Sequence, residues 1–470
     1  MKITVLGGSP KGMKSVTMQY ISFLELQYPK VEFEVLQPAF RIRRLELNSD
    51  LFEKMIETVR LSDAVLWAFP LYVHSVCSQY LRFIELIDER NAVSAFKGKP
   101  AAALSTSIHF FDHTAHDFIR AVIEDLEMSF IDSHSAKMGD IIKPEGQTSL
   151  MGFFDIFLDT IKNGYPATRA FPRQEPCEKT TASRLRSIPE VLIEAEPVKT
   201  GKKLTIITDG AEGNLEAIIE RFCSAFDDIV EIVNLQKIRI AGGCLGCLHC
   251  GPKNICRYGD TDEVVQTYLD KVHPADIIVI AAKITGRWHS SLMKAFIDRG
   301  FFHTHQPFLG GKQVAILFDG NIAANPALRE GITGYVEWQG GNLNGIVTTR
   351  DSDSAVIALA RRVILSLEKN YQRPATFLGV AGLNLFRDEI YMQLSIVFSA
   401  DYRYYRKNGI YNTMPHKQPF QLLKFRFIGI IAAIPPIRRW IVKNMKDLML
   451  MPYRDVLKNE TARNRAASLD

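Results

Sequence analysis

Two segments far apart in the chain share one order of apolar and polar residues. Residues 62–90 read SDAVLWAFPLYVHSVCSQYLRFIELIDER, and residues 274–300 read PADIIVIAAKITGRWHSSLMKAFIDRG. Further along, FKGKPAAALSTS at 96–107 corresponds to LGGKQVAILFDG at 309–320. Such a correspondence indicates an internal duplication of about 170 residues, so that one fold is built twice. Two unrelated domains of similar composition are the alternative.

Each half alternates short β-rich runs with helical patterns, which is typical of a parallel sheet wrapped by helices. The first half predicts strands at Ile3–Leu6, Val31–Leu36, Ala64–Ala68, Ala101–Thr106 and Ser129–Asp132, and helices at Thr17–Leu26, Leu51–Arg60, Gln79–Asp88 and His116–Leu126. The second half predicts strands within 202–210, 228–235, 275–282, 312–320 and 343–349, and helices within 213–226, 261–272, 289–300 and 354–369. Apolar runs such as AVLWAF are nearly continuous, as expected of strands covered on both faces. The fold class is therefore α/β, with two tandem doubly wound parallel sheets.

The domain boundaries follow from composition. We expect one domain at 1–163, a linker at 164–202 that holds five prolines, a second domain at 203–370 and an extension at 371–470. The whole chain has a formal net charge of +5, whereas the extension alone has sixteen basic and seven acidic residues. No nucleic-acid-binding motif accompanies this charge. We therefore expect a mostly helical extension that packs over the domains or across a dimer, with contact to a membrane surface as the less favoured alternative.

The first predicted strand runs into the loop GGSPKGMKSVT at Gly7–Thr17, which precedes a helix. Ligands of a doubly wound sheet bind at the carboxyl ends of its strands, and a helix N-terminus there attracts phosphate. The loop combines glycines with hydroxyl groups and two lysines. It matches neither the Walker A pattern nor GxGxxG, which disfavours ATP and dinucleotides as its ligands. The alternative is a turn that only caps the helix.

Two further loops leave the same edge of the sheet, AFPLYVHSV at 68–76 and STSIHFFDHTAHDF at 105–118. Together with GGSPKGMKSVT they make the first domain resemble the NAD(P)H-dependent FMN reductases of the flavodoxin-like superfamily. The resemblance implies that the phosphate of FMN lies among Ser9, Lys11, Ser15, Val16 and Thr17. It implies ring contacts from Pro70, Leu71, Tyr72 and Val73, and a polar ring edge formed by Ser105, Thr106 and Ser107. Val16 stands where the family commonly has Asn, so a backbone N–H replaces a side-chain donor there.

Three histidines, His109, His113 and His116, follow the predicted ring edge. One of them could donate a proton near the flavin. Helix-capping or surface positions are the favoured interpretation.

The second domain lacks these flavin motifs. Its first loop, TDGAEGNLEAI, carries Asp209 and Glu212, which would repel a phosphate, so we expect no FMN at the ordinary position there. Arg287, Trp288 and His289 stand in its second loop, where they could face a flavin or form an interdomain contact.

A four-cysteine segment, AGGCLGCLHCGPKNIC, follows the second strand of this domain. Cys244, Cys247, Cys250 and Cys256 lie within thirteen residues, a spacing that suits a [4Fe–4S] cluster. The segment resembles the cysteine motif of iron–sulfur flavoproteins. Zinc, or no metal at all, remain alternatives.

The expected function combines these features. We expect an FMN-dependent NAD(P)H oxidoreductase that transfers electrons to a small-molecule or protein acceptor, with a non-enzymatic electron-transfer protein as the alternative. In iron–sulfur flavoproteins the cluster of one subunit approaches the flavin of its partner, and this chain would fuse such a pair. The N-terminus resembles no secretory signal, so we expect a cytoplasmic protein, and we expect a homodimer.

Overall fold

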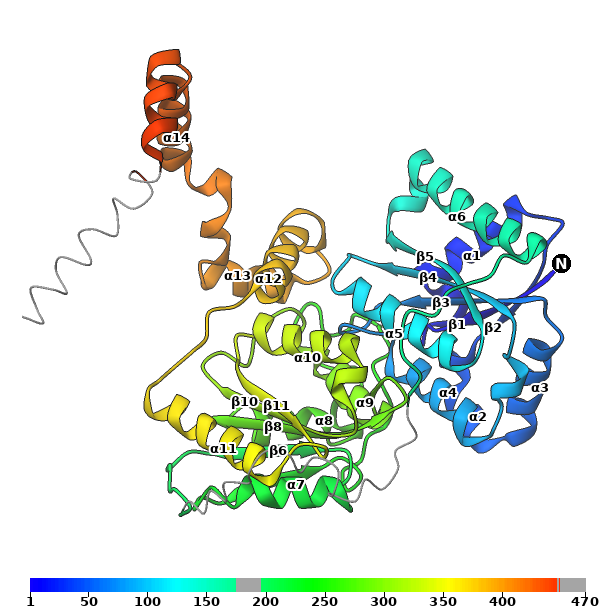
Figure 1. The fold of residues 1–470 in the computed structure, drawn as a ribbon, viewed down its shortest axis with the longest axis horizontal. Coiled ribbons are helices and arrows are strands. Elements are labelled where there is room, and N and C mark those ends of the chain that lie inside the picture. Colours follow the sequence, from blue (N-terminus) through cyan, green and yellow to red (C-terminus); the bar gives the residue numbers. More distant parts are fainter. Residues whose placement is uncertain (175–195, 446–447, 449–470) are drawn as a thin grey trace, which may run out of the picture. The chain divides into compact units, whose positions relative to one another are not determined.

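The computed structural model describes residues 1–174, 196–445 and 448. Two compact units divide at residues 402 and 403. The first unit contains two α/β domains together with the first part of the extension (Figure 1). Most of the predicted linker, residues 175–195, lies outside the described residues.

The first domain is built on a parallel five-stranded sheet in the order β2-β1-β3-β4-β5. Its strands are β1 (Lys2–Gly7), β2 (Glu32–Leu36), β3 (Ala64–Pro70), β4 (Pro100–Ser107) and β5 (Ser129–Lys137). In the middle of the sheet Val5 pairs with both Val35 and Leu66. β3 and β4 are buried along nearly their whole length, as their uninterrupted apolar sequences require. The five predicted strands are confirmed.

Six helices flank this sheet: α1 (Val16–Gln27), α2 (Pro38–Leu47), α3 (Ser49–Arg60), α4 (Ser78–Glu89), α5 (Asp112–Asp125) and α6 (Pro144–Asn163). The sequence predicted four of them and missed α2 and α6. Both missed helices begin with a proline at the first helical position, where the absent N–H costs no hydrogen bond. α2 has the sequence PAFRIRRLEL, and its apolar face is narrow because Phe40 and Leu47 point to solvent.

The second domain repeats the topology. Its parallel strands follow the order β7-β6-β8-β10-β11, and the two-residue strand β9 pairs antiparallel with β8. The strands are β6 (Leu204–Thr208), β7 (Val230–Asn234), β8 (Ile277–Thr285), β9 (Trp288–His289), β10 (Gln313–Asp319) and β11 (Asn342–Thr348). The helices are α7 (Asn214–Cys223), α8 (Val264–Thr267, continued by a π-turn to Val272), α9 (Ser291–Arg299), α10 (Pro326–Trp338) and α11 (Asp353–Glu368). The order 2-1-3-4-5 is that of a flavodoxin-like sheet, so the two tandem doubly wound sheets are confirmed.

The two domains pack against each other through matching helices, α4 on α9 and α5 on α10 (Figure 1). The facing sides of the two sheets contribute to one continuous hydrophobic cluster, while the outer sides have separate clusters. Two reciprocal contacts join α4 and α9. The amide of Ser78, at the start of α4, donates to Asp298 at 2.9 Å, and the amide of Ser291, at the start of α9, donates to Glu85 at 2.6 Å.

This reciprocity has the geometry of a twofold dimer formed within one chain. In each helix the carboxylate follows the serine by about two turns, at the same position of the repeat. Each carboxylate accepts from the free amides at the N-terminus of the opposite helix, where the helix dipole favours negative charge. The two domains therefore share an interface geometry as well as a topology.

The predicted extension contributes to both units. Helix α12 (Phe377–Glu389) packs on α10 of the second domain. Asp401 is fully buried in the first unit and accepts hydrogen bonds from the side chains of Thr304 and His305. Packing of the extension over the domains is thus observed for residues 371–402.

The second unit contains most of α13 (Ser399–Lys407), α14 (Pro419–Ala432) and a further helical segment at 435–445. Within the described residues, no helix combines the length and the apolar character that crossing a membrane requires.

Candidate functional site

The loop Gly7–Thr17 lies at the carboxyl end of β1 and leads into α1. Ser15 is the N-cap of α1, and its hydroxyl oxygen accepts from the amide of Met18 at 3.3 Å. Val16 and Thr17 open the helix, so their backbone N–H groups are among those without an intrahelical partner. Ser9 is fully buried, and its hydroxyl accepts from the amide of Lys11. The loop therefore presents hydroxyl groups, amides and a lysine at one helix N-terminus.

The three predicted flavin loops meet at one point of the sheet edge. The hydroxyl groups of Thr17 and Thr106 lie 2.7 Å apart and are both buried. The amide of Leu71 donates to the carbonyl of Thr106 at 3.3 Å. Loops that are separated by 89 residues in the sequence are thus joined directly, as the resemblance requires.

The loop Pro70–Val73 is held by the second domain. Tyr72 and Ser75 form a tight turn through two backbone hydrogen bonds, and Val73 and His74 adopt positive φ angles. Lys294 of α9 donates from Nζ to the Tyr72 carbonyl at 2.7 Å. Lys294 is buried and forms an ion pair with Asp298. A charged pair from the second domain therefore fixes the position of the predicted ring loop.

The predicted polar edge forms a hydrogen-bonded row. Ser105 lies 2.8 Å from Nε2 of His116, and Ser107 accepts from the amide of His109. His109 and the hydroxyl of Ser135 both bond to Asp112. The surface interpretation holds for His113, which is exposed and pairs with Glu330, whereas His116 is buried in α5.

Burial of His116 gives a pH-dependent prediction. Burial lowers its pKa to about 4, whereas an unfolded histidine titrates near 6.5. Between these values the unfolded chain binds a proton that the folded chain does not, so the free energy of unfolding decreases as pH falls from 6.5 to 4. The full contribution is about 3 kcal/mol, and about 2 kcal/mol of it is lost by pH 5.

Urea unfolding of wild type and His116→Gln at pH 7 and pH 5 isolates this contribution. Glutamine keeps a hydrogen-bonding partner for Ser105 but does not titrate, so the variant should lose less stability on acidification. Other buried groups, such as His303 and Asp209, titrate in both proteins and cancel in the comparison. Equal losses in the two proteins would contradict the prediction.

The residues present fit a flavin mononucleotide. The hydroxyls, lysine and helix N-terminus of the first loop are the donors that a phosphate dianion needs. Within the described part of the chain, Ser75 Oγ and His116 Nδ1 are buried without a hydrogen-bond partner, and both stand at the ring loops. These features match a ligand cradle better than a simple helix cap.

The cysteine segment lies directly against the ring loop. Gln79 Nε2 donates to the Cys244 carbonyl at 3.0 Å, and a Cβ at Gly246 would lie 1.9 Å from the hydroxyl oxygen of Tyr72. Arg299 of α9 holds the segment by donating to the carbonyl of Gly242 and by a buried ion pair with Asp262. The predicted proximity of thiols and flavin loops is therefore present in the fold.

All four cysteines line one small cavity, which they share with Tyr258 and Arg299. Cys250 is buried, Cys247 is exposed, and the other two are intermediate. Among the residues that the structure describes, no group of three or more Cys, His, Asp or Glu is arranged to hold a metal ion. Four thiolates of one short loop have the donor chemistry of an iron–sulfur cluster, which spans a wider space than one ion.

The corresponding edge of the second domain is organised differently. Asp209 accepts hydrogen bonds from the amide of Lys283 at 3.2 Å and from the hydroxyl of Ser290. Burial raises the pKa of Asp209 to about 6. Arg287 forms an ion pair with Asp125, and Trp288 packs edge-on against Phe118. The interdomain interpretation of Arg287 and Trp288 is confirmed.

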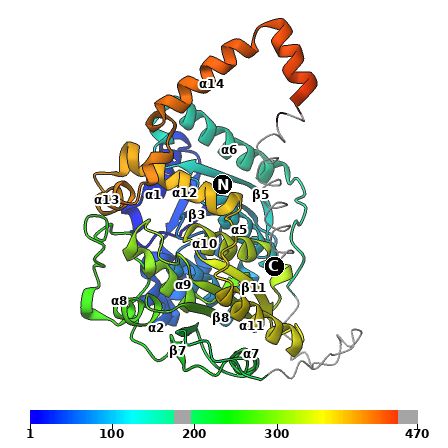
Figure 2. The same cartoon turned by 90° about the vertical axis from the view of Figure 1, so that its left-hand side faces the viewer.

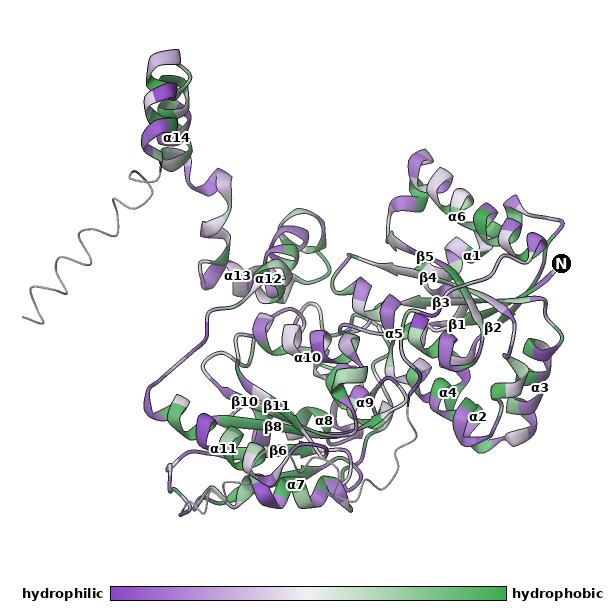
Figure 3. Cartoon of the chain, viewed as in Figure 1, coloured by the Kyte–Doolittle hydropathy of each residue, from purple (hydrophilic) through white to green (hydrophobic). Residues whose placement is uncertain are grey.

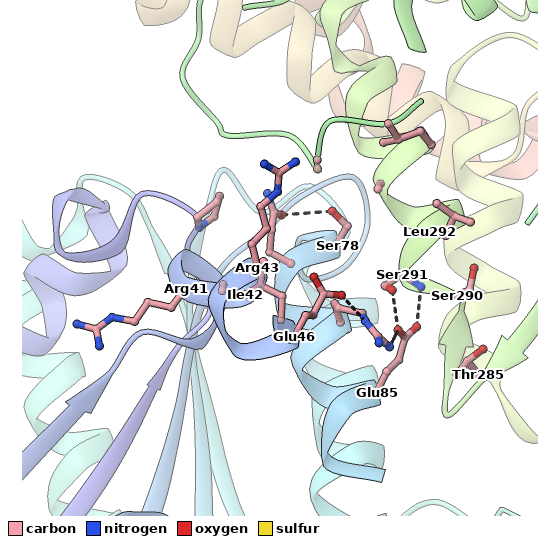
Figure 4. A pocket seen from close by; sticks show the side chains of 18 of the residues that line it. Arg41, Ile42, Arg43, Glu46, Ser78, Glu85, Thr285, Ser290, Ser291 and Leu292 are labelled. Atoms are coloured by element: carbon pink, nitrogen blue, oxygen red, sulfur yellow. Dashed lines mark hydrogen bonds and ion pairs between the residues drawn. The ribbon is translucent and has the colours of Figure 1, made fainter. Parts of the chain in front are cut away.

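A groove of about 700 Å³ separates α2 and α4 from this edge of the second domain (Figure 4). Its charged and polar lining comprises Arg41, Arg43, Arg44, Glu46, Ser78, Gln79, Arg82, Glu85, Glu89, Asp209, Gln236, Tyr258, Lys283, Thr285, Ser290 and Ser291. Arg82 is neutralised by three glutamates. Arg41, Arg43 and Arg44 form no ion pair with any residue that the structure describes. The α2 side of the groove therefore suits an anion.

Sequence reasoning missed Lys294, Asp298 and the arginines of α2 as site residues. Lys294 and Asp298 stand four residues apart in the sequence, but this spacing is typical of an ion pair on an exposed helix face. Only docking of α9 on α4 buries it.

Comparison with known proteins finds a family profile and solved structures that match part of the chain. The family profile described as NADPH-dependent FMN reductase matches residues 1–137. Among solved structures, FerB, a flavoenzyme NAD(P)H:(acceptor) oxidoreductase from Paracoccus denitrificans, is 22% identical; the alignment covers 34% of this chain and 97% of FerB, with a TM-score of 0.28. General stress protein 14 from Treponema denticola, in complex with FMN, is 12% identical over 34% of this chain and 98% of its own, with a TM-score of 0.27. No curated protein sequence matches.

Proposed function

We propose that this protein is a cytoplasmic FMN-dependent NAD(P)H oxidoreductase, because residues 1–137 match the family profile described as NADPH-dependent FMN reductase. Electrons would pass from a nicotinamide through FMN to a small-molecule or protein acceptor. The observation that carries the proposal is the meeting of the three flavin loops at Thr17, Thr106 and Leu71. Bound FMN supplies hydride and electron transfer, and the chain supplies binding and electrostatics.

Each of the three loops would contact a different part of FMN. Ser9, Lys11, Ser15, Val16 and Thr17 would hold the phosphate, Pro70–Val73 would lie along the ring, and Ser105–Ser107 would bond its polar edge. Lys294 keeps the ring loop in place through the Tyr72 carbonyl. The side chains of Lys294 and Asp298 are almost completely buried, so water is excluded from their ion pair.

The groove between the domains supports the assignment of a nucleotide donor. The groove borders Pro10 of the loop Gly7–Thr17, and Gly243 and Leu245 of the cysteine segment. The arginines of α2 on its wall suit the phosphates of a nicotinamide dinucleotide.

Rapid mixing with each nicotinamide separates an enzyme from an electron carrier. Protein loaded with FMN under anaerobic conditions is mixed with NADH or NADPH, and the visible absorbance of the flavin is followed. We expect at least one of them to bleach the flavin within seconds. Bleaching by dithionite, but by neither nucleotide over minutes, would overturn the enzyme proposal and favour the carrier.

The position of the cysteine segment supports a second cofactor. We propose that Cys244, Cys247, Cys250 and Cys256 hold a [4Fe–4S] cluster, which supplies one-electron transfer when bound. Their common cavity and the contact of Gly246 with Tyr72 favour this proposal.

Metal analysis of anaerobically purified protein tests the cluster directly. We expect iron and sulfide with the broad visible absorbance of a cluster, and loss of both in Cys244→Ala. Cys223→Ala is the matched control, because Cys223 lies on α7 outside the segment. Zinc, or no metal, in wild-type protein would refute the cluster while leaving the flavin proposal intact.

A further inference from the structure

The second unit has an extreme charge pattern. Between residues 403 and 445 there are nine Lys and Arg residues and no Asp or Glu. Five of the basic residues lie on α14 or the helical segment after it: Lys424, Arg426, Arg438, Arg439 and Lys443. Such a stretch attracts an anionic surface and repels a basic one.

The same two helices expose large apolar side chains. Phe420 is 86% exposed, Ile430 70% and Val442 67%. Further exposed apolar residues are Leu422, Leu423, Phe427, Ile428, Ile431, Ile434, Trp440 and Met445. Figure 3 shows hydrophobic and hydrophilic residues interleaved along α14. Exposed apolar area of this extent on a helix pair indicates a surface that binds a partner.

A bend joins the two helices. α14 ends at Ala432, and residues 435–445 continue as a second helical segment in a different direction (Figure 2). Pro435 and Pro436 stand at the junction. Proline is tolerated in the first turn of a helix but not in its interior, so these residues can begin the second helical segment but cannot continue α14 in a straight line. α14 has 14 residues, about 21 Å of helix, which is too short to cross a hydrocarbon core of about 30 Å.

We propose that α14 and the helical segment 435–445 lie on the surface of an anionic lipid bilayer. Aromatic and aliphatic side chains enter the boundary between headgroups and acyl chains, while the lysines and arginines bind lipid phosphates and carboxylates. A lipid surface uses both features at once. Nucleic acid would use the charge but leave the isoleucines and phenylalanines in water, and a second copy of this unit would bring two strongly basic surfaces together.

Tryptophan emission provides a direct readout. The chain has four tryptophans, of which Trp67, Trp288 and Trp338 are buried and Trp440 is 56% exposed. Entry of Trp440 into the interface should shift the emission of full-length protein to shorter wavelength when vesicles of phosphatidylcholine and phosphatidylglycerol are added. Trp440→Phe should abolish the shift without abolishing binding.

Vesicle flotation with full-length variants tests the two contributions. The double variant Arg438→Glu, Arg439→Glu and the double variant Phe427→Ser, Ile430→Ser should each lower the partition coefficient on anionic vesicles by at least about tenfold. Lys30→Glu and Ile229→Ser, which change exposed residues of the first unit, are the matched controls and should bind as wild type does. Added salt should weaken the binding.

Three results would overturn the proposal. The first is failure of wild-type protein to float with anionic vesicles, and the second is equal binding to vesicles of phosphatidylcholine alone. The third is a wild-type oligomer that dissociates in the Phe427→Ser, Ile430→Ser variant by light scattering without vesicles, which would assign the apolar surface to a second copy. Flavin binding is measured on the same preparations, so failure here is distinguishable from failure of the proposed function.

Discussion

Replacing Thr17 by valine is expected to raise the Kd for FMN by roughly ten- to a hundredfold. Valine has nearly the same shape but lacks the hydroxyl that we assign to the phosphate. A hydrogen bond to a charged group contributes about 1.5–3 kcal/mol, which corresponds to that range of affinity. Titration of apo-protein with FMN, followed by quenching of flavin fluorescence, measures the change.

A second buried threonine provides the control for this substitution. Thr205 on β6 of the second domain is buried and donates to the carbonyl of Lys271 at 2.8 Å, whereas the predicted flavin loops belong to the first domain. Thr205→Val also leaves a polar group without its partner, so it should cost similar stability and leave FMN affinity unchanged. If both variants weaken FMN binding equally, Thr17 is not a phosphate ligand.

Replacing Asp298 by alanine is expected to lower the free energy of unfolding by about 3–5 kcal/mol. The substitution leaves the ammonium of Lys294 buried, with 1% of its side chain exposed, and without its ion-pair partner. It also removes the acceptor of the Ser78 amide, one of the two reciprocal contacts between the domains. Urea unfolding of the whole chain, followed by circular dichroism, measures the loss.

Two variants establish the cause of this loss. Glu57→Ala removes the partner of Arg60 in a half-exposed ion pair and should cost less than about 1 kcal/mol. The double variant Lys294→Met, Asp298→Leu removes both buried charges and should be considerably more stable than Asp298→Ala. A double variant as unstable as the single one would show that the unpaired ammonium is not the cause.

Most of the fold could be predicted because the central strands are recognisable from their own residues. β3 and β10 are buried on both faces, so all of β3 and the middle of β10, from Val314 to Phe318, are apolar. The loops after β1, β3 and β4 were predicted to meet because the carboxyl ends of parallel strands share one edge of the sheet. Helices α2, α6 and α10 were missed, since each begins with a proline that sequence reasoning takes for a break.

The sequence by itself thus predicted two parallel sheets and the three loops that we assign to a flavin, because periodicity and loop chemistry are local properties. Only the tertiary structure decided that Lys294 supports the Tyr72 carbonyl and that Asp298 and Glu85 cap each other's helices. It also decided which residues of the cysteine segment touch the first domain, with Gly246 packed on Tyr72 and the Cys244 carbonyl bonded to Gln79. These contacts join residues about 165–220 positions apart, and their energies depend on burial that neither domain creates alone. The physical reason is that the energy of an ion pair or a hydrogen bond depends on how much water surrounds it. Water is excluded from these contacts only when the two domains dock.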